Sequence, residues 1–459
     1  MSTKTSDVRV CSVQITKIPV KLRVPLKFGT AAVDDISCVR VKMEVENRQG
    51  KRAIGWGETP MSAQWVWPST VPYHERLGAM ETFCEDLETA WTEFQEWGHP
   101  MELGSRFQWN VLDPRLDQFN KERGGEGMPH LGGLVCNSPF DIALHDAFGV
   151  VNEVPTYQTY NAKWMSEDLS AFLQPAADSK VDFKGVFPEQ FLIANPPQQL
   201  PAWHLVGGLD PLDDSERTGN EPDDGFPVTL EEWIKRDGLK CLKIKLRGND
   251  YAWDYARMIA IGKISIAMGV DWLSTDFNCT VMDPQYVNDM LDQLMKEEPR
   301  IYGMILYVEQ PFPYDLEAHE IDVHSVSARK PLFMDESAHD WKYVRMGRAL
   351  GWNGVALKTC KTQTGAILSA CWAKAHGIPL MVQDLTNPML AQIPHCLLAA
   401  HVGTIMGVET NAPQFYPTAS DKEAVIHPGL YTRKNGIVDL STLQGPGFGY
   451  RIAEMYGKE

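Results

Sequence analysis

Three acidic residues stand at the ends of short apolar runs, where their side chains could bind a metal ion. Glu309 closes the run Met304–Pro313, MILYVEQPFP, and the prolines behind it prevent the strand from continuing. Asp276 in DWLSTDFN and Asp335 in PLFMDES hold the same position in the runs before and after it. If the three runs are parallel strands, their carboxylates meet at one rim. Hard divalent cations such as Mg²⁺ prefer carboxylate oxygens, so the pattern predicts a cation site.

Lysines at two further strand ends could transfer protons beside those carboxylates. Lys243 and Lys245 lie two residues apart in Cys241–Leu246, so they share the face opposite the apolar residues of that strand. Lys358 ends the run GVALK, on the opposite side of a ring of eight strands. Because the reference pKa of lysine is about 10.4, we expect burial and a cationic neighbour to lower it. Lys361 could do this for Lys358, or it could be a solvated loop residue.

Each of these residues also has a structural interpretation. A single Asp after a strand often caps the following helix, and a network of lysines and carboxylates at a barrel mouth can be a structural salt bridge. Asp384, Glu409 and Asn411 follow two later apolar runs. These three side chains could hold the distal part of a substrate, or they could be helix caps.

The second half of the chain alternates short apolar runs with helical stretches. This order predicts an α/β fold of the (β/α)₈ barrel type, in which active sites lie at the carboxyl ends of the strands. The eight runs from Leu200 onward are WHLVG, CLKIKL, WLSTDF, MILYVE, PLFMDE, GVALK, PLMVQD and GVET.

The first part of the chain predicts an α+β domain. Alternating runs between about residues 8 and 59 are typical of antiparallel strands, and residues 73–122 have helical spacing. Between the first two strands, Val24–Asp35 is expected to be a loop long enough to act as a lid. A helix is predicted over Ser138–Gly149, with Ser138 as N-cap and Pro139 at its first position. Glu58, at a strand end before a proline, is interpreted as a solvated turn residue.

We place the domain boundary after residue 135, with the barrel over residues 136–430. Two irregular segments near residues 161–200 and 208–226 are interpreted as insertions over the surface. The second of them is strongly acidic.

Composition limits the partners and the compartment. The net charge of −17 argues against nucleic acid and anionic membranes, which both attract basic surfaces. The nine cysteines show no C-x-x-C spacing, which favours reduced thiols in a cytosol. The N-terminal MSTKTSDVRV lacks the apolar core of a signal peptide, and no run is long enough to span a membrane. We therefore expect a cytoplasmic protein with a small-molecule carboxylate substrate, assembled as a homo-oligomer.

The order of these motifs resembles the enolase superfamily. K-x-K, D-x-N, E-Q-P, D-E-S and a lysine on the sixth strand are similar to the muconate-lactonizing-enzyme subgroup of the mandelate racemase/muconate lactonizing enzyme family. The resemblance implies a capping domain to which residues 431–459 return, and Val24–Asp35 as its closing specificity loop. It also implies that Asp276, Glu309 and Asp335 are the Mg²⁺ ligands. Lys245 and Lys358 would be the acid/base catalysts, with Lys243 supporting them.

The leading hypothesis is Mg²⁺-dependent removal of the proton α to a carboxylate, with racemisation or epimerisation as the outcome. Dehydration of a hydroxy or sugar acid by a lyase mechanism and cycloisomerisation share the first step. A binding protein with a decayed site is a further alternative. A zinc hydrolase would need histidines such as H-x-H, and the first barrel run offers only His204. The seventh strand ends in QDLTNP, without the histidine of the mandelate-racemase dyad.

Overall fold

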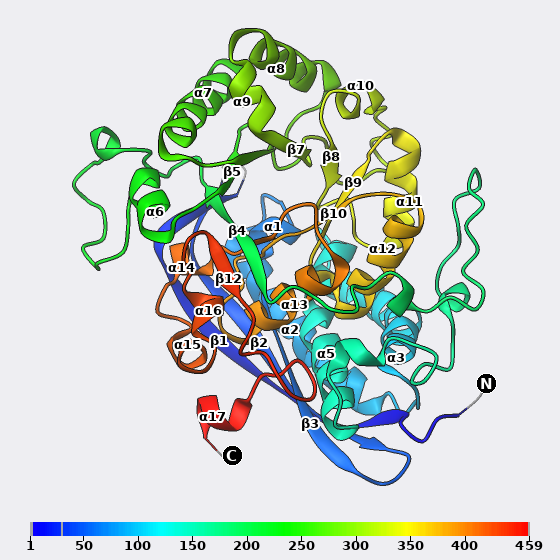
Figure 1. The fold of residues 1–459 in the computed structure, drawn as a ribbon. Coiled ribbons are helices and arrows are strands. Elements are labelled where there is room, and N and C mark those ends of the chain that lie inside the picture. The colour runs from blue at the N-terminus through cyan, green and yellow to red at the C-terminus, as the bar shows by residue number, and fades with distance from the viewer. Residues whose placement is uncertain (1–2, 29–30, 458–459) are drawn as a thin grey trace.

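Two sheets organise the chain, a three-stranded antiparallel sheet and a curled parallel sheet (Figure 1). The computed structural model describes residues 3–28 and 31–457. The first sheet contains β1 (Val8–Phe28), β2 (Ala31–Asn47) and β3 (Arg52–Pro60), in the order β1-β2-β3. Its three strands match the predicted ones.

Alternation along β2 explains why this sheet has one buried face. Val39, Val41, Met43 and Val45 are fully buried, and they lie two residues apart, so their side chains leave the same face of the strand. Helices cover that face and complete the α+β unit. Their bounds are α1 Ala63–Val66, α2 Tyr73–Glu93, α3 Pro100–Phe107, a π-helical turn Gln108–Leu112, α4 Asp113–Arg123 and α5 His130–Val151.

The expected loop over Val24–Asp35 is instead the outer end of the β1–β2 hairpin. Leu26 pairs with Val33 and Lys21 with Asp35, so both strands continue through this segment, and residues 29–30 lie outside the described part of the chain. Between those two pairs, four residues of β1 face one residue of β2, which is a β-bulge. Strand pairing across the bulge therefore makes an arm where sequence reasoning expected a loop.

Helix α5 is longer than predicted. It begins at His130 and not at Ser138, and Pro139 lies inside it. Residues 131–149 are all buried, so the burial of this largely apolar segment offsets the hydrogen bond that Pro139 cannot donate. The boundary predicted at residue 135 falls within this continuous helix.

Two glycines of β3 allow α5 to lie directly on the sheet. A Cβ atom on Gly55 would stand 2.1 Å from the backbone nitrogen of Ala147, and one on Gly57 would stand 2.0 Å from the carbonyl oxygen of Pro139. Both contacts are to helix backbone, which cannot move aside as a flexible side chain can. The helix and the sheet are therefore joined without intervening side chains.

Replacing Gly55 with alanine is expected to destabilise the protein by on the order of 3 kcal/mol, because the added methyl group must push α5 away from β3. The measurement is the midpoint of thermal unfolding. Gly78→Ala is the matched control: it lies in α2 with nothing within 4 Å of the new Cβ. That control should raise stability by about 0.5–1 kcal/mol through helix propensity. Equal midpoints for the two variants would contradict the close contact.

The parallel sheet confirms the (β/α)₈ barrel. Its order is β10-β9-β8-β7-β6-β5-β4-β11, and β11 and β10 come together to close the ring. The strands are β4 Gln199–Val206, β5 Cys241–Lys245, β6 Trp272–Asp276, β7 Ile305–Glu309, β8 Leu332–Met334, β9 Gly354–Leu357, β10 Leu380–Val382 and β11 Val408–Glu409. All eight coincide with the predicted runs.

Helices surround this barrel as the alternating sequence predicts (Figure 1). Their apolar faces pack on Leu242, Ile244 and the equivalent residues of neighbouring strands, which form one large core. The helices are α6 Leu230–Asp237, α7 Tyr251–Met268, α8 Pro284–Glu297, α9 Pro299–Met304, α10 His324–Ser327, α11 Trp341–Leu350, α12 Gln363–Ala375 and α13 Gln392–Val402.

The C-terminal segment contacts both parts of the molecule. Asp146 of α5 accepts hydrogen bonds from the backbone nitrogens of Phe448 (2.8 Å) and Trp56 (2.9 Å), and Arg40 of β2 lies 4.7 Å from the ring centre of Tyr456. The segment contains α14 Ala412–Phe415, α15 Asp421–Ile426, α16 Pro428–Tyr431, β12 Ile437–Asp439 and α17 Ile452–Tyr456. Strand β12 pairs antiparallel with β4.

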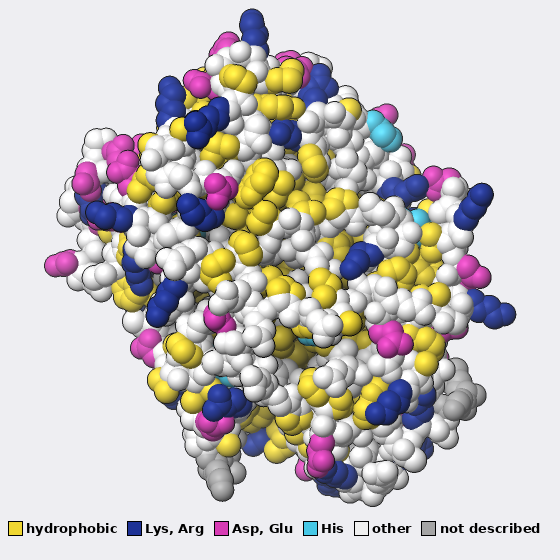
Figure 2. All heavy atoms as spheres, viewed as in Figure 1, with side chains coloured by type: hydrophobic (Ala, Val, Ile, Leu, Met, Phe, Trp, Pro, Cys, Tyr) yellow, Lys and Arg dark blue, Asp and Glu magenta, His cyan; other side chains and the backbone are white. Residues whose placement is uncertain are grey.

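Glu58 is a buried partner in this region and not the solvated turn residue that the sequence suggested. It is 1% exposed, and Arg40 Nε donates to it at 2.6 Å. On the surface, acidic and basic side chains are interspersed over the face shown in Figure 2. Within residues 3–28 and 31–457, no helix has the length and apolar character needed to cross a membrane.

Candidate active site

All nine predicted site residues are buried at the carboxyl-terminal rim of the barrel. Lys245, Asp276 and Glu309 occupy matching positions at the ends of β5, β6 and β7, because strand register pairs Lys245 with Asp276 and Asp276 with Glu309. Asp335 follows β8, and Lys358 follows β9. In the ring, β5 and β9 are four strands apart, so Lys245 and Lys358 approach from opposite sides.

On one side, the two lysines of β5 contact carboxylates from three other strands. Lys243 Nζ lies 2.6 Å from Glu309 Oε1, 3.1 Å from Asp276 Oδ2 and 3.3 Å from Glu409 Oε2. Lys245 Nζ donates to Asp276 Oδ2 as well. These contacts satisfy the requirement that a buried ammonium group be paired with negative charge.

On the other side, Asp335 receives two lysines. Lys358 Nζ lies 3.2 Å from its Oδ2 and also donates to the carbonyl of Asp384 at 3.0 Å. Lys361 Nζ lies 3.3 Å from Asp335 Oδ1 and is 97% buried, since its exposed fraction is 3%, so it is not a solvated loop residue.

Trp65 of α1 covers these two lysines from the α+β part of the chain. The centre of its ring lies 5.2 Å from Lys358 Nζ and 5.7 Å from Lys361 Nζ. Its indole Nε1–H donates to Glu336 Oε1 at 2.9 Å. One side chain thus joins the cap to the barrel directly above the site.

A small cavity of about 20 Å³ lies among these groups. Asp276 and Glu309 are not part of its wall, and their carboxylates contact Lys245 and Lys243. A cavity of this size has room for about one water molecule. The lining residues are Trp65, Leu205, Lys243, Lys245, Asp335, Lys358, Asp384, Leu385, Thr386, Glu409 and Asn411.

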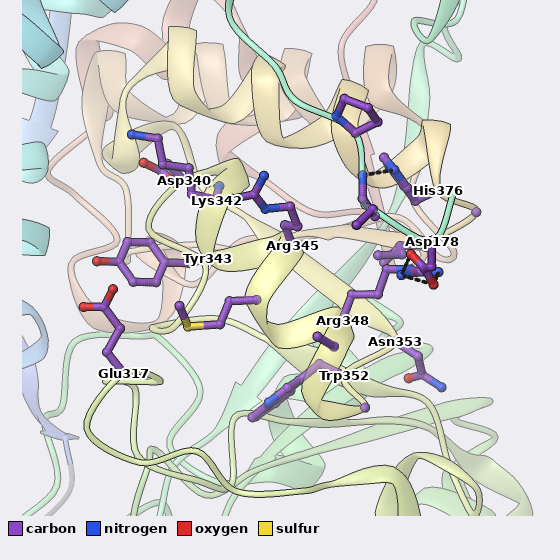
Figure 3. Close-up of a pocket in the computed structure, with 18 of the residues that line it drawn as sticks. Asp178, Glu317, Asp340, Lys342, Tyr343, Arg345, Arg348, Trp352, Asn353 and His376 are labelled. Atoms are coloured by element: carbon purple, nitrogen blue, oxygen red, sulfur yellow. Dashed lines mark hydrogen bonds and ion pairs between the residues drawn. The ribbon is translucent and has the colours of Figure 1, made fainter. Parts of the chain in front are cut away.

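A much larger groove of about 1320 Å³ lies outside the barrel along α11 (Figure 3). It holds the ion pair between Arg348 and Asp178, whose Nη1 and Oδ1 atoms are 2.8 Å apart. None of the nine predicted site residues lines it. Size alone therefore does not identify the site, and the concentration of paired charges at the rim does.

The carboxylates of the rim have pKa values that move in opposite directions. Burial raises the pKa of Glu309 well above its usual value, and the negative charge of Asp276 adds to this effect. Burial alone would also raise the pKa of Asp276, but Lys245 and Lys243 hold it well below its usual range. Burial and Asp335 raise the pKa of Glu336 to about 7. Negative charge is thus concentrated between β6 and β8.

The prediction that the pKa of Lys358 is lowered is wrong. Burial lowers the pKa of Lys243, but the upward effect of Glu309 and the other carboxylates is larger. The pKa of Lys243 is therefore well above its usual value. Burial also lowers the pKa of Lys358, but the negative charge of Asp335 has the larger effect, so the pKa of Lys358 is raised above its usual value. The cause is that sequence reasoning placed cationic neighbours beside these lysines, whereas the closest charged groups in the fold are carboxylates.

The three residues expected to hold a distal substrate group also serve the structure of the rim. Asp384 accepts hydrogen bonds from the backbone nitrogens of Asn387 (2.6 Å) and Asn411 (2.5 Å). Asn411 donates to Glu409 Oε1 at 2.7 Å and accepts from the backbone nitrogen of Leu205 at 3.2 Å. These contacts link the loops after β10 and β11 to β4, so all three residues help to shape the cavity they line.

The loops that follow the barrel strands hold strained backbone. Positive φ values occur at Asn278 and Cys279 after β6, at Gln310 after β7, at Thr362 after β9 and at Thr386 after β10. Non-glycine residues rarely adopt this conformation, and it clusters at functional sites. The strained residues here follow the predicted ligands and lysines within a few positions of the chain.

Sequence reasoning missed three side chains of the site. Glu336 adjoins Asp335, and its Oε2 atom is buried without a partner in the described part of the chain. Gln383 Nε2 donates to Glu309 Oε2. Glu336 directly follows Asp335 in D-E-S, and Gln383 directly precedes Asp384 in Q-D. This adjacency to predicted site residues is the sequence signal that could have identified them. No sequence signal pointed to Trp65, because it lies in α1, which follows β3 of the antiparallel sheet and is far from the barrel motifs in the chain.

The donor set fits a hard divalent cation by its chemistry. Asp276, Glu309 and Asp335 supply only carboxylate oxygens from three consecutive strands, which suits Mg²⁺. As placed, these oxygens contact ammonium groups. Consistent with this, across residues 3–28 and 31–457 no three or more acidic, histidine or cysteine side chains converge as metal ligands. A bound cation would therefore have to compete with Lys243 and Lys245 for the oxygens of Asp276 and Glu309. At Asp335 it would have to compete with Lys358 and Lys361.

These observations define a class: a (β/α)₈ barrel whose rim carries facing lysines and carboxylates beneath an α+β cap. The family model described as "Enolase C-terminal domain-like" matches residues 227–456. The chain belongs to the enolase superfamily, in the mandelate racemase/muconate lactonizing enzyme family, and it is an enzyme of that superfamily. The predicted family resemblance is confirmed.

Solved structures show the same fold. The L-Ala-D/L-Glu epimerase from Bacillus subtilis is 18% identical over 88% of this chain and 89% of its own, with a TM-score of 0.59. A dipeptide epimerase from Enterococcus faecalis, complexed with Mg and L-Leu-L-Tyr, is 16% identical over 96% and 99%, with a TM-score of 0.60. The N-succinyl Arg/Lys racemase from Bacillus cereus is 17% identical over 96% and 95%, with a TM-score of 0.60. No curated protein sequence matches the chain.

Proposed function

We propose that this enzyme removes the proton α to a substrate carboxylate on one face of the carbon and returns a proton to the other face. The reaction is then a racemisation or epimerisation. The observation that carries the proposal is the opposed placement of Lys245 and Lys358, which line one cavity from strands four apart in the ring. Two groups on opposite sides are what inversion at a carbon requires.

In this proposal Asp276, Glu309 and Asp335 hold Mg²⁺. The cation would supply positive charge that stabilises a substrate carboxylate as it gains electron density. Lys243, which contacts Glu309 and Asp276, would remain beside the substrate as a fixed positive charge. The negative charge of Asp335 now raises the pKa of Lys358. If a bound cation neutralised that charge, the pKa of Lys358 would fall, and Lys358 could then accept a proton.

The cavity wall and the structural relatives support a choice of substrates to test. Glu409 and Asn411 line the wall next to Leu205, so we assign them to the distal part of the substrate, with Asp384 shaping the loop beside them. Structural relatives include epimerases of dipeptides and a racemase of an N-succinyl amino acid. Dipeptides and N-acyl amino acids are therefore the first compounds to test, with sugar acids after them.

The test is proton NMR in D₂O with Mg²⁺ over pools of dipeptides, N-acyl amino acids and sugar acids. Loss of an α-proton signal without a new product is the expected result, and it names the substrate class. A new vinyl or 2-keto signal would replace the proposal with dehydration. No exchange in any pool would contradict the proposal for these substrates. Glu309→Gln serves as the control that should show no exchange.

Replacing Trp65 with leucine is expected to lower kcat/KM by roughly tenfold, because both lysines beneath the ring lose a cation–π contact. Trp65→Phe keeps a ring and loses only the indole N–H bond to Glu336, so its loss should be smaller. The measurement is steady-state kinetics on the substrate found by NMR. Equal losses in the two variants would assign the effect to the hydrogen bond and not to the ring.

A further inference from the structure

The acidic insertion after β4 reaches from the barrel to the cap. We call residues 207–229 the strap; it is the green loop that projects beside α6 in Figure 1. Its base is fixed, because Arg257 Nη2 donates to the carbonyls of Gly207 and Asp210 at 2.8 Å each, and Gln414 donates to Asp210 Oδ2 at 2.9 Å. The strap therefore has a rigid attachment to the barrel.

The far end of the strap binds Arg23 of β1. Arg23 lies in the β-bulge described above, and its side chain is 9% exposed. Its Nε donates to Asp224 Oδ2 at 2.7 Å and its Nη2 to Asp224 Oδ1 at 2.8 Å, while Nη1 donates to the carbonyl of Pro227 at 3.2 Å. This is a two-pronged arginine–carboxylate pair, the geometry with the greatest directional specificity. Arg23 thus lies where the regular pairing of β1 with β2 is interrupted.

We call residues 20–25 and 33–36 the arm. Val20, Val33 and Ile36 of the arm form an apolar cluster with residues of the barrel rim, and Leu205 of that cluster also lines the catalytic cavity. The rim members of the cluster are Leu205, Met389, Ala412, Phe415 and Tyr416. The arm therefore covers the side of the cavity formed by β4 and the loops after β10 and β11.

The strap and the arm are joined at one place. A cavity of about 350 Å³ separates them elsewhere, with Val24 on one wall and Leu209 on another. Within the described part of the chain, the polar contacts between strap and arm are all made by Arg23. Loss of the Arg23 side chain would thus remove every one of these polar contacts without disturbing either attachment.

We infer that Arg23 is a positioning residue: through Asp224 it ties the arm to the strap and keeps the arm seated on the rim over the catalytic cavity. As the arm lies here, the cavity measures only about 20 Å³, so movement of the arm would open it to an amino-acid-sized substrate. The pair of Arg23 and Asp224 then sets how often the arm lifts. That the cavity is catalytic rests on the proposed function; the link between strap and arm does not.

Hydrogen–deuterium exchange, read in peptides covering residues 20–25 and 33–36, tests the inference without a substrate. Asp224→Asn and Arg23→Gln should each speed exchange in the arm by about threefold or more, and the double variant should add nothing beyond Arg23→Gln, which already removes every contact that Asp224→Asn removes. Asp223→Asn is the matched control, because it removes the same charge from the neighbouring residue, which has no hydrogen bond or ion pair in the described structure. It should exchange as the wild type does. Strands β6 and β7 should be unchanged in every variant.

Salt gives a second measurement on the unmodified protein. Raising ionic strength should speed exchange in the arm of the wild type and leave Asp224→Asn unaffected, since the pair is partly exposed to solvent. With a substrate available, Arg23→Gln should change KM while kcat stays near the wild-type value. Wild-type exchange rates in Asp224→Asn, or equal acceleration by Asp223→Asn, would overturn the inference. If the variants show faster exchange in the arm but the protein turns over no carboxylate, the proposed function is refuted and the inferred link between strap and arm stands.

Discussion

Glu309→Gln is expected to abolish turnover and to weaken Mg²⁺ binding by at least roughly a hundredfold. The substitution keeps the size of the side chain and removes its charge from a fully buried position between Asp276 and Asp335. Lys243 would keep Asp276 and Glu409 as partners, so the fold should tolerate the change. Titration calorimetry with Mg²⁺ measures the loss of binding, and the NMR exchange assay measures the loss of activity.

Glu58→Gln is the matched control for this prediction. Glu58 is also buried and also contacts a cationic side chain at 2.6 Å, in this case Arg40, but it lies in the antiparallel sheet. That variant should bind Mg²⁺ as the wild type does, whatever it does to stability. If Glu309→Gln instead retained wild-type stoichiometry and affinity, Glu309 would have to be removed from the ligand set.

Lys358→Ala is expected to lower racemisation by at least about a thousandfold while Mg²⁺ affinity stays near the wild-type value, because a proton-transfer group is lost and the three carboxylates remain. The two enantiomers of the substrate should respond differently. The one whose α-proton faces Lys358 should lose exchange with D₂O, and the other should still exchange through Lys245. Each enantiomer is followed separately by NMR.

Lys361→Ala distinguishes proton transfer from simple neutralisation of charge. Lys358 and Lys361 both contact Asp335, at 3.2 and 3.3 Å, and both lie beneath Trp65, but only Lys358 lines the cavity. The Lys361 variant should therefore retain far more activity. Equal losses in the two variants would mean that Lys358 acts by neutralising Asp335 and not by moving a proton.

Several parts of this protein could be predicted because their signals are local. Short apolar runs separated by helical stretches define parallel strands, and the last residue of each run must lie at the barrel rim, whatever the loops do. Asp276, Glu309 and Lys358 were located in this way, and the order of the motifs identified the family. Lys243 and Lys245 were placed on one face by the alternation of side chains along a strand.

The order of residues along the chain therefore identifies which side chains reach the rim. The packing of the folded chain fixes which groups surround them there. The pKa values of Lys243 and Lys358 are raised because carboxylates from other strands lie closest, and strand spacing contains no such information. Trp65 reaches Glu336 across 271 positions of the chain, and Arg23 reaches Asp224 across 201. Contacts at such separations leave no periodicity in either segment, because they depend on how the cap, the strap and the barrel pack together.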